Sequence, residues 1–148
     1  MKKLVFISFM LMLSTAVFAQ TYTKTSKNEI EKKQPHKIIF QLSTGDTLSH
    51  KALTKQLGNI LSVAPDTKIE VVCHGPGLNV LATDKSTISE KVKYFIAKDV
   101  VFNVCEFSMK ERNMDKSQIL PEATYVPAGI IEIVNKQEQG WSYIKAGF

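Results

Sequence analysis

From Lys37 onward, short apolar runs alternate with segments whose apolar residues recur at helical spacing. The runs are rich in β-branched and aromatic side chains, which is typical of strands buried on both faces. They lie at residues 38–42, 69–73, 100–105, 124–126 and 141–145, and helical patterns fill 53–61, 88–96 and 129–139. Strands that alternate with helices predict a three-layer α/β/α sandwich with a mostly parallel sheet of about five strands.

Three local signals refine this prediction. Thr87-Ile88-Ser89-Glu90 has the spacing of a capping box, so we expect Thr87 to cap the helix that follows. Residues 106–112 suit a short helix directly after the third strand, which would place Cys105 at the junction of a strand and a helix. The last run, 141–145, alternates in polarity and is predicted to be an edge strand.

The N-terminus has the layout of a secretory signal peptide. Two lysines follow Met1, an apolar stretch begins at Leu4, and small residues precede Gln20. A membrane anchor is the alternative, but the stretch from Leu4 to Phe18 holds only 15 residues, and a spanning helix needs about 20. We therefore expect cleavage after Ala19 and a periplasmic or secreted protein without a membrane attachment.

The rest of the chain is predicted to be a flexible polar leader, residues 20–36, and one domain, residues 37–148. Without Lys2 and Lys3, 17 of the 19 basic residues remain against 14 acidic ones, and much of this excess of positive charge lies in the leader. An excess of positive charge this small does not form a basic face. We therefore expect no nucleic-acid partner. The 2 cysteines are too few for a disulfide scaffold or a four-cysteine zinc module.

In a sheet of this kind, ligands bind beyond the carboxyl ends of the strands. Cys105 ends the third strand, and a helix that starts directly after it would favour the thiolate through its orphan amides and dipole. Lys110 and Arg112 would add positive potential, whereas Glu106 opposes it. The alternative is a buried cysteine that only finishes an apolar strand, because free cysteine is among the most buried residue types.

Cys73 and His74 end the second strand as neighbours. Adjacent residues of a strand point to opposite faces, so the two side chains do not serve one metal unless the strand has already turned. Cys73 continues the face of Ile69 and Val71, which predicts core packing. For His74 we consider either a role in loop structure or a contact with a ligand, and we expect no metal and no cofactor.

Polar and glycine residues complete the candidate ligand site. Gly75 and Gly77 would let backbone approach a ligand, although the segment lacks the residues of a phosphate loop. Asn103 and Gln41 are polar residues inside apolar strands, and Asn103 shares a face with Cys105. Asn103 would then line the same crevice or satisfy a neighbouring polar group. The candidate ligand-binding residues are His74, Gly75, Gly77 and Asn103.

Several segments, in order, resemble one protein family. Residues 71–78, VVCHGPGL, are similar to a segment of small DsrE-like proteins, and residues 102–105, FNVC, are similar to their third-strand cysteine segment. Further likeness lies in the C-terminal half, at residues 119–121, 126–129 and 139–144. The resemblance runs from about Lys37 to Lys145.

The resemblance implies the DsrE/DsrF-like fold and assembly into trimers or hexamers. It also implies that Cys105 matches the cysteine that carries sulfur as a persulfide in some members. An exported sulfur carrier with a sulfur donor or acceptor protein as partner is thus our first hypothesis. The second is a non-catalytic oligomeric ligand-binding module, with Cys73 and Cys105 either packed or joined by a disulfide, if their Cα atoms lie within about 7 Å. A metal-binding protein using Cys73, His74 and Cys105 is the third.

Overall fold

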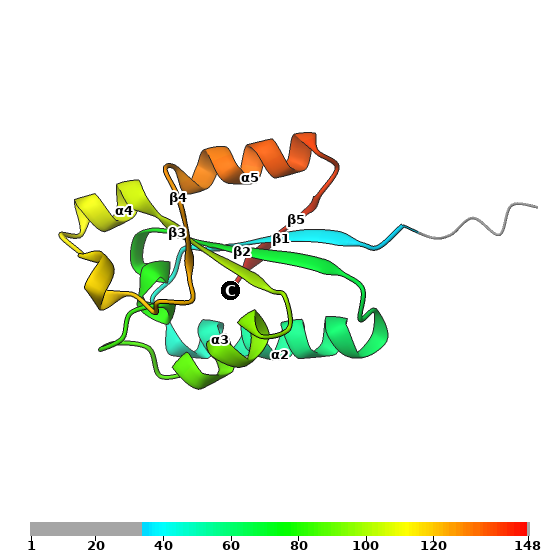
Figure 1. The fold of residues 1–148 in the computed structure, drawn as a ribbon, viewed down its shortest axis with the longest axis horizontal. Coiled ribbons are helices and arrows are strands. Elements are labelled where there is room, and N and C mark those ends of the chain that lie inside the picture. The colour runs from blue at the N-terminus through cyan, green and yellow to red at the C-terminus, as the bar shows by residue number, and fades with distance from the viewer. Residues whose placement is uncertain (1–33, 148) are drawn as a thin grey trace, which may run out of the picture. The chain divides into compact units, whose positions relative to one another are not determined.

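Five parallel strands form the sheet around which the domain is built (Figure 1). The structure, a computed structural model, describes residues 34–147, so the predicted signal peptide and nearly all of the predicted leader lie outside the described residues. The strand order is β4-β3-β2-β1-β5, with every neighbouring pair parallel. The strands are β1 (Lys37–Leu42), β2 (Lys68–Cys73), β3 (Val101–Cys105), β4 (Thr124–Val126) and β5 (Ser142–Ala146).

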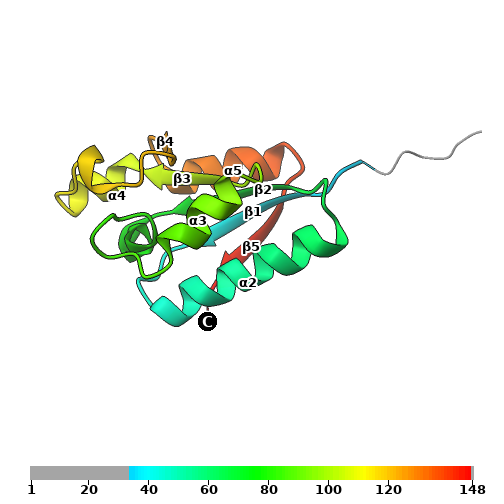
Figure 2. The ribbon, with the colours of Figure 1, turned by 60° about the horizontal axis from the view of Figure 1, so that its bottom comes forward.

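Helices cover both faces of the sheet, as Figures 1 and 2 show. Helices α2 (Thr47–Val63) and α3 (Ser89–Ile96) lie on one face, and α5 (Gly129–Glu138) lies on the other. The short helix α4 (Glu106–Glu111) follows β3 directly, and the 3₁₀ turns η1 (Gly75–Val80) and η2 (Lys116–Gln118) complete the connections. The predicted three-layer α/β/α sandwich is confirmed, and the predicted strand segments are all present.

The strand order explains why α5 stands apart from α2 and α3. From β1 to β4 the chain adds strands in one direction, and then β5 pairs with the opposite side of β1. Right-handed crossovers that run in opposite directions across a sheet place their helices on opposite faces. The connections therefore change faces after β4, and ligands of such sheets bind near a change of this kind, at the carboxyl ends of the strands.

The helix starts differ in how well the sequence predicted them. Asp46 caps α2, because its carboxylate accepts hydrogen bonds from the backbone N–H groups of Leu48 and Ser49 at 3.3 and 2.8 Å. The capping box predicted at Thr87 is wrong. Helix α3 begins at Ser89, with Ile88 at the N-cap and no side-chain cap. Ile88 is instead buried in the large apolar cluster, and its N–H donates to the hydroxyl of Ser86 at 3.4 Å.

The two faces of the sheet carry different cores. The face under α2 and α3 holds a large apolar cluster that takes alternate residues of the central strands, such as Phe40, Val71 and Phe102. The face under α5 holds a small cluster of Ile39, Val72 and Ile133 with Trp141 against it. Much of the remaining α5 face is polar, and it contains the candidate site. Within residues 34–147 no helix is both long and apolar enough to cross a membrane.

Candidate functional site

Cys105 lies where two helices begin. It is the last residue of β3 and the N-cap of the short helix α4. Its Sγ also accepts a hydrogen bond from the backbone N–H of Gly129, the first residue of α5, at 3.2 Å. The N-cap residue of α5, Ala128, has no side-chain acceptor, so the Cys105 thiol supplies the acceptor for this N–H. Cys105 is 5% exposed, so its sulfur meets this N–H donor at a buried edge of the sheet.

Gly129 brings Cys105 and His74 to one place. A Cβ atom on Gly129 would lie 3.3 Å from the Cβ of Cys105, 3.5 Å from the Cβ of His74 and 2.9 Å from Cγ1 of Val72. Only a residue without a side chain lets the start of α5 approach the sheet this closely. His74 and Cys105 are therefore neighbours on the α5 face, at the carboxyl ends of β2 and β3.

His74 belongs to a chain of polar side chains that crosses three strands. The side-chain nitrogen of Gln41 lies 2.8 Å from Nε2 of His74, and the hydroxyl of Tyr143 donates to Oε1 of Gln41. Burial lowers the pKa of His74, so the ring favours its neutral form. An amide nitrogen only donates, and a neutral ring accepts at its unprotonated nitrogen. The contact therefore identifies Nε2 as the acceptor.

Asn103 shares the face of Cys105, as predicted, but its amide is bonded to other protein groups. Asn103 donates to a carboxylate oxygen of Glu70 at 3.0 Å and accepts from the hydroxyl of Thr124 at 2.6 Å. Glu70 forms an ion pair with Lys136 of α5, and the ammonium lies 4.6 Å from the ring centre of Trp141. Asn103 is 4% exposed, and its bond to Glu70, which pairs with Lys136, connects β3 to α5. These contacts indicate a structural role for Asn103.

The two glycines of the predicted ligand loop have structural contacts. Gly75 adopts a φ of +52°, and its N–H donates to the hydroxyl of Ser108 on α4 at 2.9 Å. Gly77 is buried, and a Cβ atom there would lie 2.1 Å from the carbonyl oxygen of Leu42. The segment with both glycines thus begins the 3₁₀ turn η1, which packs against the end of β1.

Cys73 lies on the opposite face from Cys105. It is fully buried in the large apolar cluster, and burial raises the pKa of its thiol. Both cysteines are free, and the disulfide between them that we considered is wrong, because the two side chains point to opposite faces of the sheet. The same geometry separates Cys73 from His74. Among residues 34–147, no three His, Cys, Asp or Glu side chains are grouped so as to hold a metal ion.

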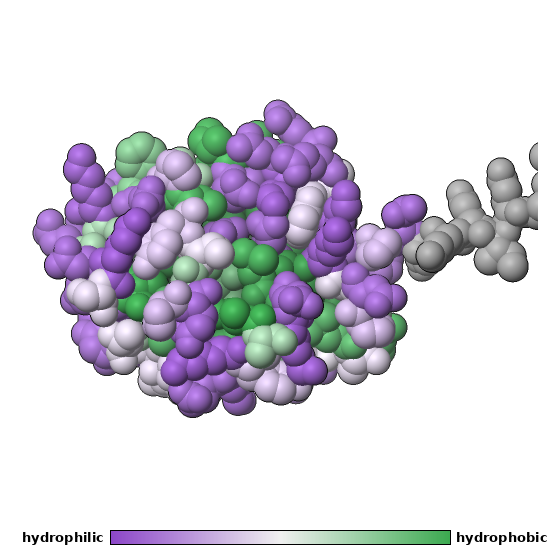
Figure 3. All heavy atoms as spheres, viewed as in Figure 1, coloured by the Kyte–Doolittle hydropathy of each residue, from purple (hydrophilic) through white to green (hydrophobic). Residues whose placement is uncertain are grey.

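Apolar side chains lie exposed around the start of α5. Phe107, two residues after Cys105, is 61% exposed, and its N–H donates to the carbonyl of Pro127, just before α5. The outer face of α5 adds three exposed aliphatic side chains, Ile130, Ile131 and Val134. In Figure 3 hydrophobic spheres interrupt the polar surface along its upper edge, over α4 and the start of α5. We call Phe107, Ile130, Ile131 and Val134 the α5 patch.

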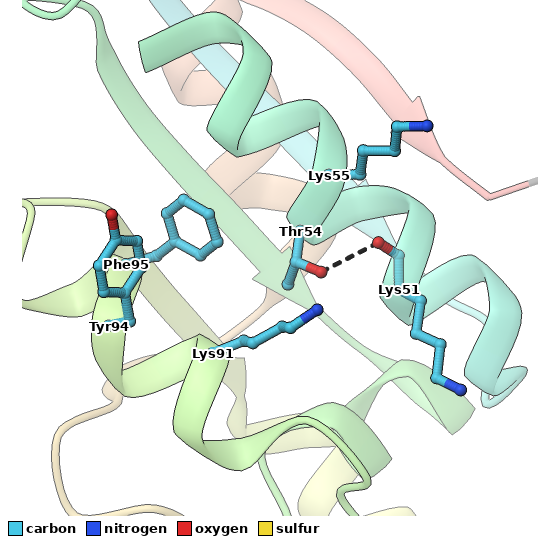
Figure 4. Close-up of a pocket in the computed structure, with 6 residues that line it drawn as sticks. All are labelled: Lys51, Thr54, Lys55, Lys91, Tyr94 and Phe95. Carbon is cyan, nitrogen blue, oxygen red and sulfur yellow. Dashed lines mark hydrogen bonds between the residues drawn. The ribbon is translucent and has the colours of Figure 1, made fainter. Parts of the chain in front are cut away.

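A second candidate site lies on the other side of the sheet. A groove of about 480 Å³ runs between α2 and α3, and Figure 4 shows its lining residues, Lys51, Thr54, Lys55, Lys91, Tyr94 and Phe95. Lys91 extends from α3 toward Thr54 of α2 in this view, and none of the three lysines forms an ion pair among the described residues. The only charged residues of α2 are Lys51 and Lys55, so this groove is positively charged.

The sequence did not reveal the role of three residues at the Cys105 site. Gly129 was predicted to start a helix, but nothing in its local pattern showed that this helix would dock on Cys105. Gln41 was noticed as a polar residue within a strand, and Tyr143 was not singled out. The alternation of β1 and β5 could have placed both on one face, but only strand order shows that β1 and β5 are neighbours.

The fold and this site define a class: a small parallel-sheet α/β protein with a cysteine at the carboxyl edge of its sheet, held at a helix start. The chain belongs to the DsrE/DsrF-like family, whose model matches residues 26–146. This finding confirms the resemblance read from the sequence.

A solved structure shares the fold. The protein of unknown function MTH1491 from Methanobacterium thermoautotrophicum matches with a TM-score of 0.72 and 28% sequence identity. The match covers 74% of this chain and 98% of that one. No curated protein matches this chain.

Proposed function

We propose that the protein carries sulfur as a persulfide on Cys105. The observation that carries this proposal is the hydrogen bond from the Gly129 N–H to Cys105 Sγ at the start of α5. A ten-residue helix supplies the aligned amides that stabilise negative charge on sulfur. Membership of a family with sulfur-relay members supports the same chemistry.

The proposed reaction is an exchange without net oxidation. The Cys105 thiolate attacks the outer sulfur of a donor persulfide, a new S–S bond forms at Cys105, and the donor leaves as its thiolate. An acceptor thiolate then attacks the outer sulfur on Cys105. The S–S bond at Cys105 breaks, the acceptor holds the sulfur, and Cys105 is again a thiolate.

We propose further that this chemistry occurs outside the cytoplasm, in an assembly of several copies. The signal-like segment before Ala19 supports export. The exposed α5 patch supports contact with a protein, either another copy or the sulfur donor or acceptor, because solvent exposure of several large apolar side chains is unfavourable. Size-exclusion chromatography with light scattering tests the trimer or hexamer.

Mass spectrometry tests sulfur carriage. The purified mature protein is incubated with polysulfide, and the intact mass is compared with that of Cys105→Ser and of the matched control Cys73→Ala. We expect wild type and Cys73→Ala to gain the mass of one sulfur atom and Cys105→Ser to gain none. Loading of Cys105→Ser would contradict the proposal. The same spectrum shows whether cleavage follows Ala19.

The groove between α2 and α3 favours a second function, binding of a small organic anion. Its lysines would meet the acidic group, and the Phe95 and Tyr94 rings would meet an apolar body. Calorimetry with phenyl phosphate and with inorganic phosphate tests this. We expect Lys91→Gln to weaken binding, whereas Lys110→Gln on α4 and Cys105→Ser should not. Equal binding by wild type and Lys91→Gln would exclude the groove as the site.

A further inference from the structure

We propose that Gln41 and Tyr143 are positioning residues of the Cys105 site, which hold the His74 ring neutral with its proton on Nδ1. The proposal that this matters for sulfur transfer rests on the proposed function. The proposal about the ring itself rests only on the contacts among these side chains.

Three strands bring the chain together. β1 pairs with β2 on one side and with β5 on the other, so Gln41 stands between His74 at the end of β2 and Tyr143 on β5. The Gln41 nitrogen donates to Nε2 of His74 at 2.8 Å, and the Tyr143 hydroxyl donates to the Gln41 oxygen. The two bonds together hold the amide with its nitrogen toward His74 and its oxygen toward Tyr143.

The orientation of Gln41 determines the state of His74. A ring nitrogen that accepts a hydrogen bond carries no proton, so a neutral His74 has its proton on Nδ1. Protonation of Nε2 would set two donors against each other and break the bond to Gln41. An unconstrained neutral histidine in water favours the proton on Nε2, so this site selects the less common tautomer.

The charge of the His74 ring affects Cys105. The Cβ atoms of Cys105 and His74 lie on either side of Gly129, so an imidazolium at His74 would add positive potential near Cys105. A neutral ring leaves the start of α5 as the group that stabilises the thiolate. Gln41 and Tyr143 therefore act on Cys105 through His74, although neither is in contact with the sulfur.

The tautomer is measured directly by long-range ¹H–¹⁵N correlation spectra of the ¹⁵N-labelled protein. We expect wild type to show an unprotonated Nε2 and a protonated Nδ1. In Gln41→Leu the proton should move largely to Nε2, and Tyr143→Phe should give a mixture. Gln56→Leu on α2 is the matched control and should leave His74 unchanged. A wild-type ring with its proton on Nε2, or a ring unaffected by Gln41→Leu, would overturn the proposal.

A second variant tests the link to Cys105. Gln41→Glu replaces the donor with an acceptor, which should keep His74 protonated at a pH where wild type is neutral. Lys145 pairs with position 41 across the β1–β5 ladder, so the variant is made in a Lys145→Gln background. We expect the rate of Cys105 alkylation by iodoacetamide near pH 6 to change several-fold. A charged His74 with an unchanged rate would refute the positioning role.

The two proposals fail in different ways. Loss of sulfur loading with the Nδ1–H tautomer in place would exclude persulfide carriage and leave the positioning of His74 intact. Sulfur loading with the proton on Nε2 would exclude the positioning of His74 and leave persulfide carriage intact.

Discussion

The two faces of the sheet differ in polarity: one is covered by a large apolar core, and the other carries bonded polar side chains. Under α2 and α3, the strands present an apolar surface that is fully covered, and Cys73 is one more apolar side chain there. Under α5, the same strands present Gln41, Glu70, His74 and Asn103, each bonded to a named partner, with Cys105 at the edge. One residue of sequence separates the two faces along a strand. That step places Cys73 in the apolar core, whereas Cys105, itself 5% exposed, lies beside the start of α5.

The largest expected difference between the faces is in thiol reactivity. Cys105 is 5% exposed at the edge of the sheet and Cys73 is 0% exposed in the core, so in the native protein we expect iodoacetamide to modify Cys105 roughly a thousandfold faster than Cys73. Reaction of Cys73 requires opening of the core, which costs about 5 kcal/mol or more, and burial also raises the pKa of its thiol. Peptide mapping after timed quenching measures both rates. Comparable rates would show that the core under α2 and α3 opens readily.

The second comparison concerns stability. Leu57→Ala on α2 should cost about 4 kcal/mol and Ile133→Ala on α5 about 2 kcal/mol, within the range for large core truncations. Leu57 is 0% exposed within the large cluster, whereas Ile133 is 5% exposed within the small one. Urea unfolding measures the difference. A greater loss for Ile133→Ala would mean that the α5 face carries the main core.

The third comparison uses two glycines. Gly129→Ala should destabilise by about 1–3 kcal/mol, because its methyl group would stand 2.9 Å from Val72 and push α5 away from Cys105. Gly58→Ala, in the middle of α2 with its nearest neighbour 3.8 Å away, should instead stabilise by about 1 kcal/mol. Thermal unfolding and Cys105 alkylation are measured for both. A neutral Gly129→Ala would argue against close docking of α5.

The smallest expected effect is the pH dependence contributed by His74. Its pKa is lowered by burial, so the unfolded chain takes up a proton at a higher pH than the native protein does. His74 should therefore favour the folded state fully above its unfolded pKa. This contribution is lost as pH falls from about 6.5 toward the native pKa, with a slope of at most about 1.4 kcal/mol per pH unit. Urea unfolding of wild type and His74→Gln between pH 7 and 5, a range of about two units, measures the slope, which the variant should lack.

The fold could be predicted because each element has a local cause. The apolar runs at residues 69–73 and 100–105 and the helical stripe around Leu53 and Leu57 became β2, β3 and α2 with small changes at their ends. The start of α3 was mispredicted, because a buried Ile88 outweighed the polar signal at Thr87. Local patterns fail where a tertiary contact contributes more than a cap.

The candidate site could be predicted only in part. Cys105 and His74 stood out because a polar or reactive side chain at the end of an apolar strand is visible in the sequence. Gly129, which donates to Cys105, lies 24 residues from it along the chain. Tyr143, which donates to the His74 partner Gln41, lies 102 residues from Gln41. No periodicity carries such pairings, because they depend on which strands are neighbours.

The sequence by itself determined the period of each element, the parallel α/β class and the family, since burial and turn chemistry act within a few residues along the chain. Only the tertiary structure decided that β5 joins β1, that α5 docks its first N–H on Cys105, and that Cys73 and Cys105 never meet. The physical reason is that strand order and helix docking are fixed by contacts between distant segments. Those contacts place one cysteine, Cys73, in the apolar core on one face and the other, Cys105, beside the start of α5 on the opposite face.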